Sequence, residues 1–318
     1  MILVVLNSLC DMPMRKCNCI AVQILVVDNA HSQLVTCGTA IQGTCQSRSL
    51  FNISFYETNA IPESRIHYGF VASTDPTHPA VAFVAPGPSN NIRLYVGIND
   101  SPLSPTRYYY RQYTCGVSSR YLSGDDIFQI PEPDIFDQLG QFAQLAEEAA
   151  TSQKFWVKYV TGFSVGGYSY FLTTQPAEYS SDGSITPTVS KLSQVCQNDS
   201  LFDSYVEMQI NCQSDSRNYS FVRAATLLRP GSRLATALGV SATEHLLVAA
   251  FYDESDSALC VYRLSDIRRR FTENIQACYD SASLPVGRQF RGSKQCTPDP
   301  QVRQHVICHV LDTCLIYA

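Results

Sequence analysis

Short apolar runs recur along the chain, and residues that favour turns separate them. The runs are QILVVD, QLVTCG, AVAFVAP, RLYVGI, FWVKYV, YSYFLTT, SYVEMQI, HLLVAAFY and ALCVYRL. β-branched and aromatic residues are frequent in them, which is typical of strands, and few longer helical periods lie between them. The pattern predicts one all-β domain, built as a sandwich, a barrel or a propeller.

Two segments depart from this pattern. Residues 135–150 carry apolar side chains at helical spacing, and residues 265–277 repeat Ile267, Phe271 and Ile275 at every fourth position. This spacing places the apolar side chains of each segment on one side of a helix. Both segments are therefore predicted to be short helices packed on the β domain.

The stretch GFSVG fits the Gly-x-Ser-x-Gly pattern of a hydrolase nucleophile elbow, with Ser164 as the nucleophile. An elbow needs a strand before the serine and a helix after it. Residues 168–174 are instead aromatic and β-branched, which favours a second strand. A β-hairpin is therefore predicted, with Gly162, Gly166 and Gly167 available for positive φ.

The chain order still leaves a serine hydrolase open as an alternative. Asp203 or Asp215, followed by His245, comes after Ser164 in the order that such enzymes use. The missing helix weighs against this hypothesis.

A metal site is a second chemical alternative. His305 and His309 are four residues apart and flank Cys308. The glutamate of a His-Glu-x-x-His motif is missing, and Pro298 and Pro300 precede the pair. No metal or other cofactor is therefore expected.

Composition narrows the class of function. The chain has 318 residues, of which 45% are hydrophobic, so it can bury a large core. A net charge of -5 with 16% charged residues argues against a nucleic-acid-binding protein. The only approach to a basic cluster is residues 268–270, followed by Arg288, Arg291 and Lys294. These residues are expected to form a solvated face. The apolar runs are far shorter than the ~20 residues that span a bilayer.

Thirteen cysteines are too many for an ordinary cytosolic enzyme, and no Cys-x-x-Cys pair with zinc spacing occurs. Disulfides formed in an oxidising compartment explain them better. Four Asn-x-Ser sequons agree with this and are predicted glycosylation sites: Asn52, Asn99, Asn198 and Asn218.

Several of these stretches together resemble a known family. LVVDNAHSQLVTCGTAIQGTCQ is similar to a part of plexin sema domains in which an aspartate after an apolar strand precedes a Cys-Gly…Gly-x-Cys hairpin. GVSSRYL, GFSVGGYSYFLTTQP, VCQNDSLFDSYVEMQINC, SALCVYRLSDI and QACYD then follow in the plexin order and at fitting separations. The resemblance to the plexin family covers residues 20–308.

The resemblance implies a sema-type β-propeller, which has seven blades in the family, each a four-stranded antiparallel sheet. We expect a partial ring of about four blades with short helical insertions. Residues 1–19 and 309–318 match nothing in the family, so a fragment, a truncated gene model or a divergent short form is expected. An open arc leaves two blade faces in water, and we therefore expect poor solubility or association of this chain alone.

The resemblance also implies disulfides. Carried onto the matching positions, the family's pairs are Cys37 with Cys45, Cys196 with Cys308, Cys212 with Cys260, and Cys278 with Cys296. Five cysteines have no implied partner: Cys10, Cys17, Cys19, Cys115 and Cys314.

The implied function is recognition and not catalysis. The chain resembles an extracellular ligand-binding segment of a plexin-like semaphorin receptor, with a semaphorin-type sema-domain protein as partner and homo-association as a further possibility. The implied location is the extracellular face of the plasma membrane in the parent protein, or secretion if the short form is real. A sema domain of a hepatocyte growth factor receptor-like kinase and a semaphorin ligand are the alternatives. Residues 108–111, Tyr-Tyr-Tyr-Arg, are of a kind enriched in interfaces, but an edge strand explains them equally well, so the ligand-binding residues stay unassigned.

Overall fold

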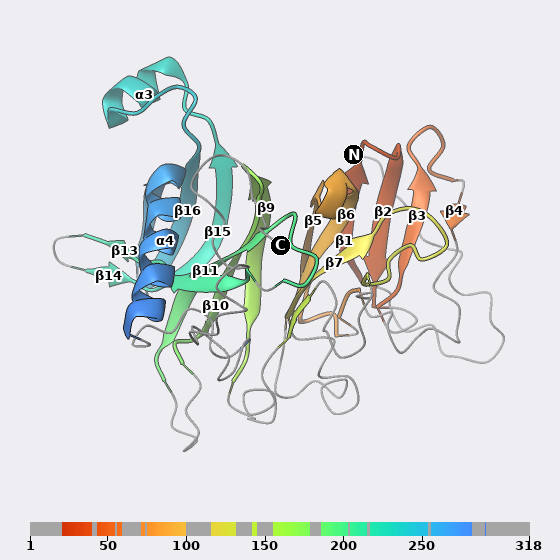
Figure 1. The fold of residues 1–318 in the computed structure, drawn as a ribbon, viewed down its shortest axis with the longest axis horizontal. Helices are drawn as coiled ribbons and strands as arrows, with labels where there is room; N and C mark the ends of the chain where they lie inside the picture. Colours follow the sequence, from red (N-terminus) through yellow and green to blue (C-terminus); the bar gives the residue numbers. More distant parts are fainter. Residues whose placement is uncertain are drawn as a thin grey trace.

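The computed structural model describes residues 21–39, 43–54, 56–58, 71–73, 75–99, 116–131, 142–144, 155–178, 186–202, 204–214, 217–253, 256–281 and 290. Antiparallel β-sheets form most of this part of the chain (Figure 1). Two α-helices accompany the sheets in the described ranges, α3 (Ser232–Leu238) and α4 (Leu264–Ser281). None of the helices in the described ranges is long and apolar enough to cross a bilayer.

Three of the sheets are four-stranded and are built from strands in consecutive order. The first sheet contains β1 (Val22–Asp28), β2 (Gln33–Gly38), β3 (Cys45–Ser49) and β4 (Tyr56–Thr58). The second sheet contains β5 (Ala80–Pro86), β6 (Ile92–Ile98), β7 (Gly116–Tyr121) and β8 (Phe142–Gln144). The third sheet contains β9 (Lys158–Val165), β10 (Tyr168–Pro176), β11 (Thr188–Cys196) and β12 (Val206–Gln209). Within each of these sheets, every strand pairs antiparallel with the next one in sequence. The two-residue link between β9 and β10 is so short that it can join only antiparallel neighbours.

The fourth sheet has three strands, β15 (Phe221–Leu228), β16 (Leu246–Asp253) and β17 (Asp256–Arg263). A small two-stranded ribbon, β13 (Cys212–Gln213) and β14 (Asn218–Tyr219), connects the third sheet to the fourth. The first strands of successive sheets are in contact: β1 with β5, β5 with β9, and β9 with β15 (Figure 1). The four sheets therefore follow one another side by side, in chain order.

A hydrophobic core fills the space between each pair of neighbouring sheets. Ile24 and Leu94 belong to the core between the first and second sheets, and Tyr95 and Phe171 belong to the core between the second and third. The third core lies between the third and fourth sheets and includes Leu172 together with residues of α4. Because successive side chains of a strand point to opposite faces, neighbouring residues of β6 and β10 enter different cores. The two middle sheets are thus buried on both faces.

The helix predicted for residues 265–277 is confirmed, because α4 spans Leu264–Ser281 and buries Ile267 and Phe271. The helix predicted for residues 135–150 is wrong where the structure describes it. Residues 142–144 form β8, and Ala143 pairs with Val117 and enters a core. Pairing to the edge of β7 overrides the helical spacing, and the rest of that segment lies outside the described residues.

The hairpin predicted around Ser164 is confirmed. β9 and β10 pair from Val165 and Tyr168 outward, and the two residues between them, Gly166 and Gly167, have φ of 57° and 79°. A two-residue turn of this kind needs positive φ at both positions, which glycine adopts without steric cost. Gly162, in contrast, lies within β9 and takes no part in the turn.

Candidate functional site

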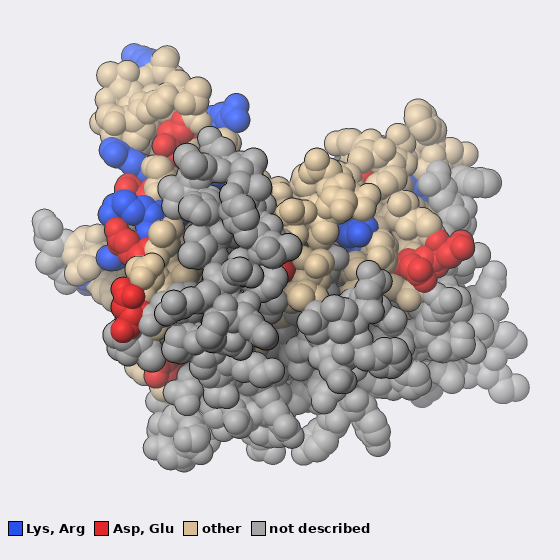
Figure 2. Space-filling model, viewed as in Figure 1, with Lys and Arg blue, Asp and Glu red and all other residues tan. Residues whose placement is uncertain are grey.

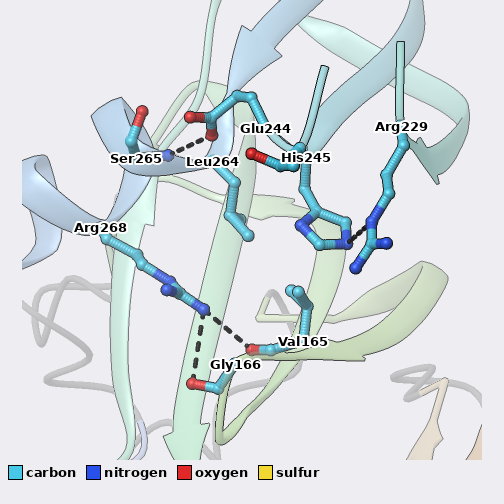
Figure 3. Close-up of a pocket in the computed structure, with 9 residues that line it drawn as sticks. Val165, Gly166, Arg229, Glu244, His245, Leu264, Ser265 and Arg268 are labelled. Atoms are coloured by element: carbon cyan, nitrogen blue, oxygen red, sulfur yellow. Dashed lines mark hydrogen bonds between the residues drawn. The ribbon is translucent and has the colours of Figure 1, made fainter. Parts of the chain in front are cut away.

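Arg268 of α4 reaches the tip of the β9–β10 hairpin. Its Nη2 donates to the carbonyl oxygens of Val165, at 3.1 Å, and Gly166, at 3.4 Å (Figure 3). Its Nε donates to the hydroxyl of Tyr170 at 3.4 Å, and the guanidinium lies 5.6 Å from the centre of the Tyr168 ring. The planar guanidinium offers several donors in a fixed geometry, so one side chain joins α4 to both strands of the hairpin.

An open cleft of about 500 Å³ lies beside this contact (Figure 3). It lies between the hairpin tip, the residue that follows β15, the loop before β16 and the first turns of α4. The lining residues are Val165, Gly166, Arg229, Thr243, Glu244, His245, Leu264, Ser265 and Arg268. Four segments that are far apart in the sequence therefore meet at this cleft.

Polar contacts set the orientation of the side chains in the cleft. The Nε of Arg229 donates to Nε2 of His245 at 3.1 Å, so this ring nitrogen is an acceptor. On the opposite side, Oε1 of Glu244 accepts a hydrogen bond of 3.2 Å from the backbone N–H of Ser265. A carboxylate that accepts from the first turn of a helix satisfies a backbone donor and interacts favourably with the helix dipole. Glu244 thus stabilises the start of α4.

The cleft combines cationic side chains with an apolar floor. Arg229 and Arg268 carry fixed positive charge, and Val165 and Leu264 contribute aliphatic surface. Guanidinium groups beside aliphatic side chains are suited to hold an acidic or polar side chain of another protein.

Disulfides hold the first and fourth sheets. Cys37 of β2 and Cys45 of β3 are directly paired in the sheet and bonded, and Cys212 of β13 is bonded to Cys260 of β17. Both pairs are the ones that the plexin resemblance implies. Cys196 and Cys278 are also disulfide-bonded. Their expected partners, Cys308 and Cys296, lie outside the described residues, as do the five cysteines without an implied partner.

Comparison with known proteins supports the resemblance to the plexin family. The family profile described as Sema domain matches residues 222–317. Human plexin-A4 is 27% identical over 288 residues, covering 85% of this chain, and human plexin-A3 is 30% identical over 273 residues, covering 81%. A solved structure of the full extracellular region of plexin A4, domains 1 to 8, superposes with a TM-score of 0.68 and 26% identity, over 85% of this chain. The chain is a relative of the plexin-A sema domains.

The match concerns a small part of each relative. The sema-related chain spans 14% of human plexin-A4 and of human plexin-A3, and 30% of the solved extracellular chain. The resemblance to the plexin family is confirmed, and the fold of small antiparallel sheets is that of a sema domain.

The serine hydrolase hypothesis has no support in the geometry of the sema domain. Ser164 pairs with Ser169 inside the hairpin, so a strand follows it where an elbow needs a helix. His245 is bonded to Arg229 and lines the cleft, which Ser164 does not. Asp203 and Asp215 lie outside the described residues.

The metal hypothesis falls on residues that the structure does not describe. The residues concerned, His305, Cys308 and His309, all lie outside the described ranges. Among the described residues, no group of three or more His, Cys, Asp or Glu side chains is placed to hold a metal ion.

The four sequons differ in accessibility. Asn52, Asn198 and Asn218 are exposed on the surface, and glycosylation there stays a prediction. Asn99 is only 7% exposed, and its Oδ1 accepts a 2.6 Å hydrogen bond from the backbone N–H of Tyr159. This burial is incompatible with a glycan, so the prediction for Asn99 is wrong. The side chain instead joins the second sheet to β9.

The basic cluster 268–270 serves two roles. Arg269 pairs with Asp266 and Glu273, and Arg270 pairs with Glu273, all on the exposed side of α4. Blue and red side chains accordingly lie next to each other along α4 in Figure 2. The expected solvated face is confirmed for these two arginines, whereas Arg268 turns inward to the hairpin. Arg288, Arg291, Lys294 and the aromatic run 108–111 lie outside the described residues.

Sequence reasoning missed Arg229 and Glu244. Arg229 lies 16 positions from His245, and Glu244 lies 21 positions from Ser265. Neither spacing corresponds to a local motif, and only an isolated charge between apolar strands marks either residue in the sequence.

Proposed function

We propose that this chain is an extracellular ligand-binding segment of a plexin-like semaphorin receptor. In this proposal residues 20–308 form a partial sema domain, flanked by residues 1–19 and 309–318, and the four sheets are successive blades of a propeller arc. The observation that carries it is the sequential contact of β1, β5, β9 and β15, since blades that surround one axis are expected to bring their first strands together.

The composition of the cleft is suited to recognition of another protein. The guanidinium of Arg229 lies beside the aliphatic side chains of Leu264 and Val165 among the lining residues, an arrangement that can hold a polar or acidic side chain. Loops and turns on a rigid β scaffold are common places for binding residues. We propose this cleft as part of the surface that a semaphorin-type sema-domain protein contacts.

The disulfides support the proposed location. The bonds of Cys37 with Cys45 and of Cys212 with Cys260 are suited to an oxidising compartment. We therefore propose the extracellular face of the plasma membrane for a parent receptor, or secretion for this chain by itself. The plexin-A relatives favour a plexin over a growth factor receptor kinase.

A binding experiment tests the proposal. The chain, secreted from eukaryotic cells, is immobilised and exposed to a panel of semaphorin extracellular regions. We expect saturable binding of at least one, and Arg229→Glu should weaken it at least ~10-fold because charge reversal opposes an acidic partner. Arg270→Glu, on the exposed side of α4, is the matched control and should change binding less than ~2-fold.

Two results would contradict the proposal. Absence of binding across the panel would oppose the receptor function. Equal loss of binding in both arginine variants would oppose the assignment of the cleft. Esterase activity that Ser164→Ala removes would instead revive the hydrolase hypothesis.

A further inference from the structure

Arg93 of β6 is a buried cation that the domain does not pair with an acceptor. Its side chain is in a residue only 8% exposed, and its Nε is enclosed without a hydrogen-bond partner. Among the described residues, none accepts a hydrogen bond from the guanidinium, which lies 4.1 Å from the centre of the Tyr121 ring. A ring covers the face of a guanidinium and leaves the N–H donors at its edge unpaired.

The other two buried arginines of the described ranges differ from Arg93 in this respect. Arg120, which is 1% exposed, donates to the carbonyl oxygen of Phe128 at 3.0 Å. Arg48, which is 5% exposed, donates to the carbonyl oxygen of Ile53 at 3.0 Å. Burial of a cation costs free energy unless acceptors compensate for the lost water. Arg93 therefore keeps donors for an acceptor from outside the domain.

The guanidinium of Arg93 opens to the surface at one end of the second sheet. Arg93 pairs with Ala85 of β5 and with Tyr121 of β7, and the β5–β6 turn (residues 87–91) packs on its aliphatic stem. A Cβ on Gly87 would lie 2.5 Å from Cγ of Arg93, so glycine leaves the room that this stem needs. Nε is the enclosed nitrogen of the guanidinium, and a ligand can therefore reach the two Nη nitrogens.

This end of the second sheet is continuous with the hairpin tip at the candidate cleft. The carbonyl oxygen of Gly167 accepts a hydrogen bond of 2.9 Å from the N–H of Gln197. The next residue, Asn198, accepts a hydrogen bond of 3.3 Å at its Oδ1 from the N–H of Ser89. The β9–β10 turn, the loop after β11 and the β5–β6 turn are thus joined in a row, and Arg93 lies beside the last of them.

The charges around Arg93 favour a single carboxylate as its ligand. The β5–β6 turn and residues 197–202 contain no Lys or Arg, whereas a sulfated polysaccharide or a nucleic acid binds to clustered cations. Asp199 of the loop after β11 does not fill this role, because its carboxylate accepts hydrogen bonds from the backbone N–H groups of Leu201 and Ser204. The two Nη nitrogens of one guanidinium match the two oxygens of one carboxylate.

We propose that Arg93 anchors an aspartate or glutamate side chain of the semaphorin-type partner, whose carboxylate binds the Nη nitrogens. The partner supplies the acceptors that the domain does not give to this cation. The inference rests on the proposed function, and it extends the contact surface from the cleft to the second sheet.

Urea unfolding tests whether the domain itself uses the charge of Arg93. Arg93→Met removes an unpaired buried charge and keeps an aliphatic stem, so the midpoint of unfolding should stay the same or rise. Arg120→Met is the matched control, because Arg120 is equally buried but hydrogen-bonded, and its midpoint should fall. A fall of the same size in both variants would overturn the inference, because it would show that the domain itself holds the Arg93 guanidinium.

Nuclear magnetic resonance of the arginine Nε–H groups tests carboxylate binding without a partner protein. Sodium acetate is the probe, and the Arg93 signal is identified by its loss in Arg93→Met. This signal should shift saturably with acetate and not with sodium chloride at equal ionic strength. Arg223 is the control, because it lies 4.0 Å from the centre of the Tyr252 ring but is exposed, and its signal should show no acetate-specific shift. Absence of the acetate shift at Arg93, or a shift with sodium sulfate alone, would overturn the inference.

Binding to the semaphorin panel tests the partner. Arg93→Met should weaken binding at least ~10-fold because charge-assisted hydrogen bonds are lost, and Arg223→Met should change it less than ~2-fold. Normal binding of Arg93→Met together with weak binding of Arg229→Glu would overturn this inference and leave the proposed function in place. Absence of binding to every semaphorin would oppose the proposed function, and the acetate shift would then decide by itself whether Arg93 is a carboxylate site.

Discussion

Arg268 donates to the carbonyl oxygen of Val165, 103 residues earlier in the chain, at 3.1 Å. The contact joins the first turns of α4 to the hairpin tip of the third sheet, although α4 follows directly from β17 of the fourth sheet. The backbone carbonyls at the tip of a two-residue turn need partners when another element packs over them. Arg268 supplies these donors. It thereby fixes α4 to the hairpin tip, beside the core between the third and fourth sheets.

Arg268→Met tests this role. The substitution keeps an aliphatic stem and removes the donors, so we expect it to lower the free energy of unfolding by about 1–3 kcal/mol. Arg270→Met, which removes only exposed ion pairs, should cost less than about 0.5 kcal/mol. Urea unfolding of both variants measures the difference. If both variants lose the same unfolding free energy, the hydrogen bonds from Arg268 to the hairpin make no specific contribution to stability.

Asp28 makes the stability of the first sheet dependent on pH. The carboxylate is buried and accepts hydrogen bonds from His31 at 2.6 Å and Gln33 at 2.8 Å. Burial raises the pKa of Asp28, but the hydrogen bonds of Gln33 and His31 lower it by more, so the pKa falls below the ordinary value of 3.8. Because the folded pKa is the lower one, this stabilisation is present above pH 3.8 and is lost as the pH falls through the folded pKa.

Asp28→Asn should therefore destabilise the domain at neutral pH, by about 1–3 kcal/mol, and the difference from the unmodified chain should shrink in acid. Unfolding free energies measured from neutral pH down to acid check this. Asp75→Asn is the control, because the pKa of Asp75 is also lowered, by hydrogen bonds from Thr77, but its carboxylate is partly exposed and should contribute less. A difference independent of pH would contradict the role of the Asp28 carboxylate.

Glu207 is a buried acid in the third sheet. Its carboxylate accepts hydrogen bonds from Tyr205 at 2.8 Å and Gln175 at 3.0 Å, and lies 3.4 Å from Nζ of Lys191. Removing it leaves a buried cation and two buried donors without this acceptor. Glu207→Ala is expected to cost about 3–5 kcal/mol in unfolding free energy. Glu273→Ala is the control, because Glu273 is exposed, and it should cost at most about 0.5 kcal/mol. Thermal or urea unfolding measures both variants. Similar losses of unfolding free energy in Glu207→Ala and Glu273→Ala would contradict the prediction.

Gly162 is required by close packing between sheets. A Cβ at this position would lie 2.5 Å from the Phe83 ring of the second sheet. Gly162→Ala should therefore destabilise the domain by about 1–3 kcal/mol. Gly231→Ala is the control, because open space surrounds its added Cβ, and it should cost about 0.5 kcal/mol or less.

A double-mutant cycle tests the cause of the Gly162 effect. Phe83→Leu provides room for the added methyl group, so the double variant should be less destabilised than the sum of the single variants, by about 0.5–3 kcal/mol. If the losses of unfolding free energy in the two single variants simply add in the double variant, the steric contact with Phe83 does not cause the effect of Gly162→Ala.

Local patterns predicted some elements well. The Gly166-Gly167 turn followed from glycine chemistry, and α4 followed from the spacing of Ile267, Phe271 and Ile275. β11 (Thr188–Cys196) and β15 (Phe221–Leu228) were not recognised, because Ser, Lys and Gln in the first and Arg and Ala in the second interrupt the apolar pattern. The polar residues of β11 are nonetheless buried, since hydrogen bonds within the domain satisfy them, as for Ser193 and the Phe171 carbonyl.

The candidate cleft was beyond the reach of sequence reasoning. Its parts come from the β9–β10 turn, the end of β15, the loop before β16 and the start of α4. Arg268 was expected on a solvated face together with Arg269 and Arg270, and only the position of the hairpin tip beneath α4 turned it inward.

The sequence alone determined the β class, the short hairpins, the disulfide-rich character and the kinship with plexin sema domains, because these depend on local residue chemistry and on the order of motifs. The tertiary structure decided which face of each strand enters which core, that residues 142–144 extend a sheet, that Asn99 is buried and that Arg268 binds the hairpin. These features depend on contacts between residues far apart in the chain, where packing and hydrogen bonding outweigh local preference.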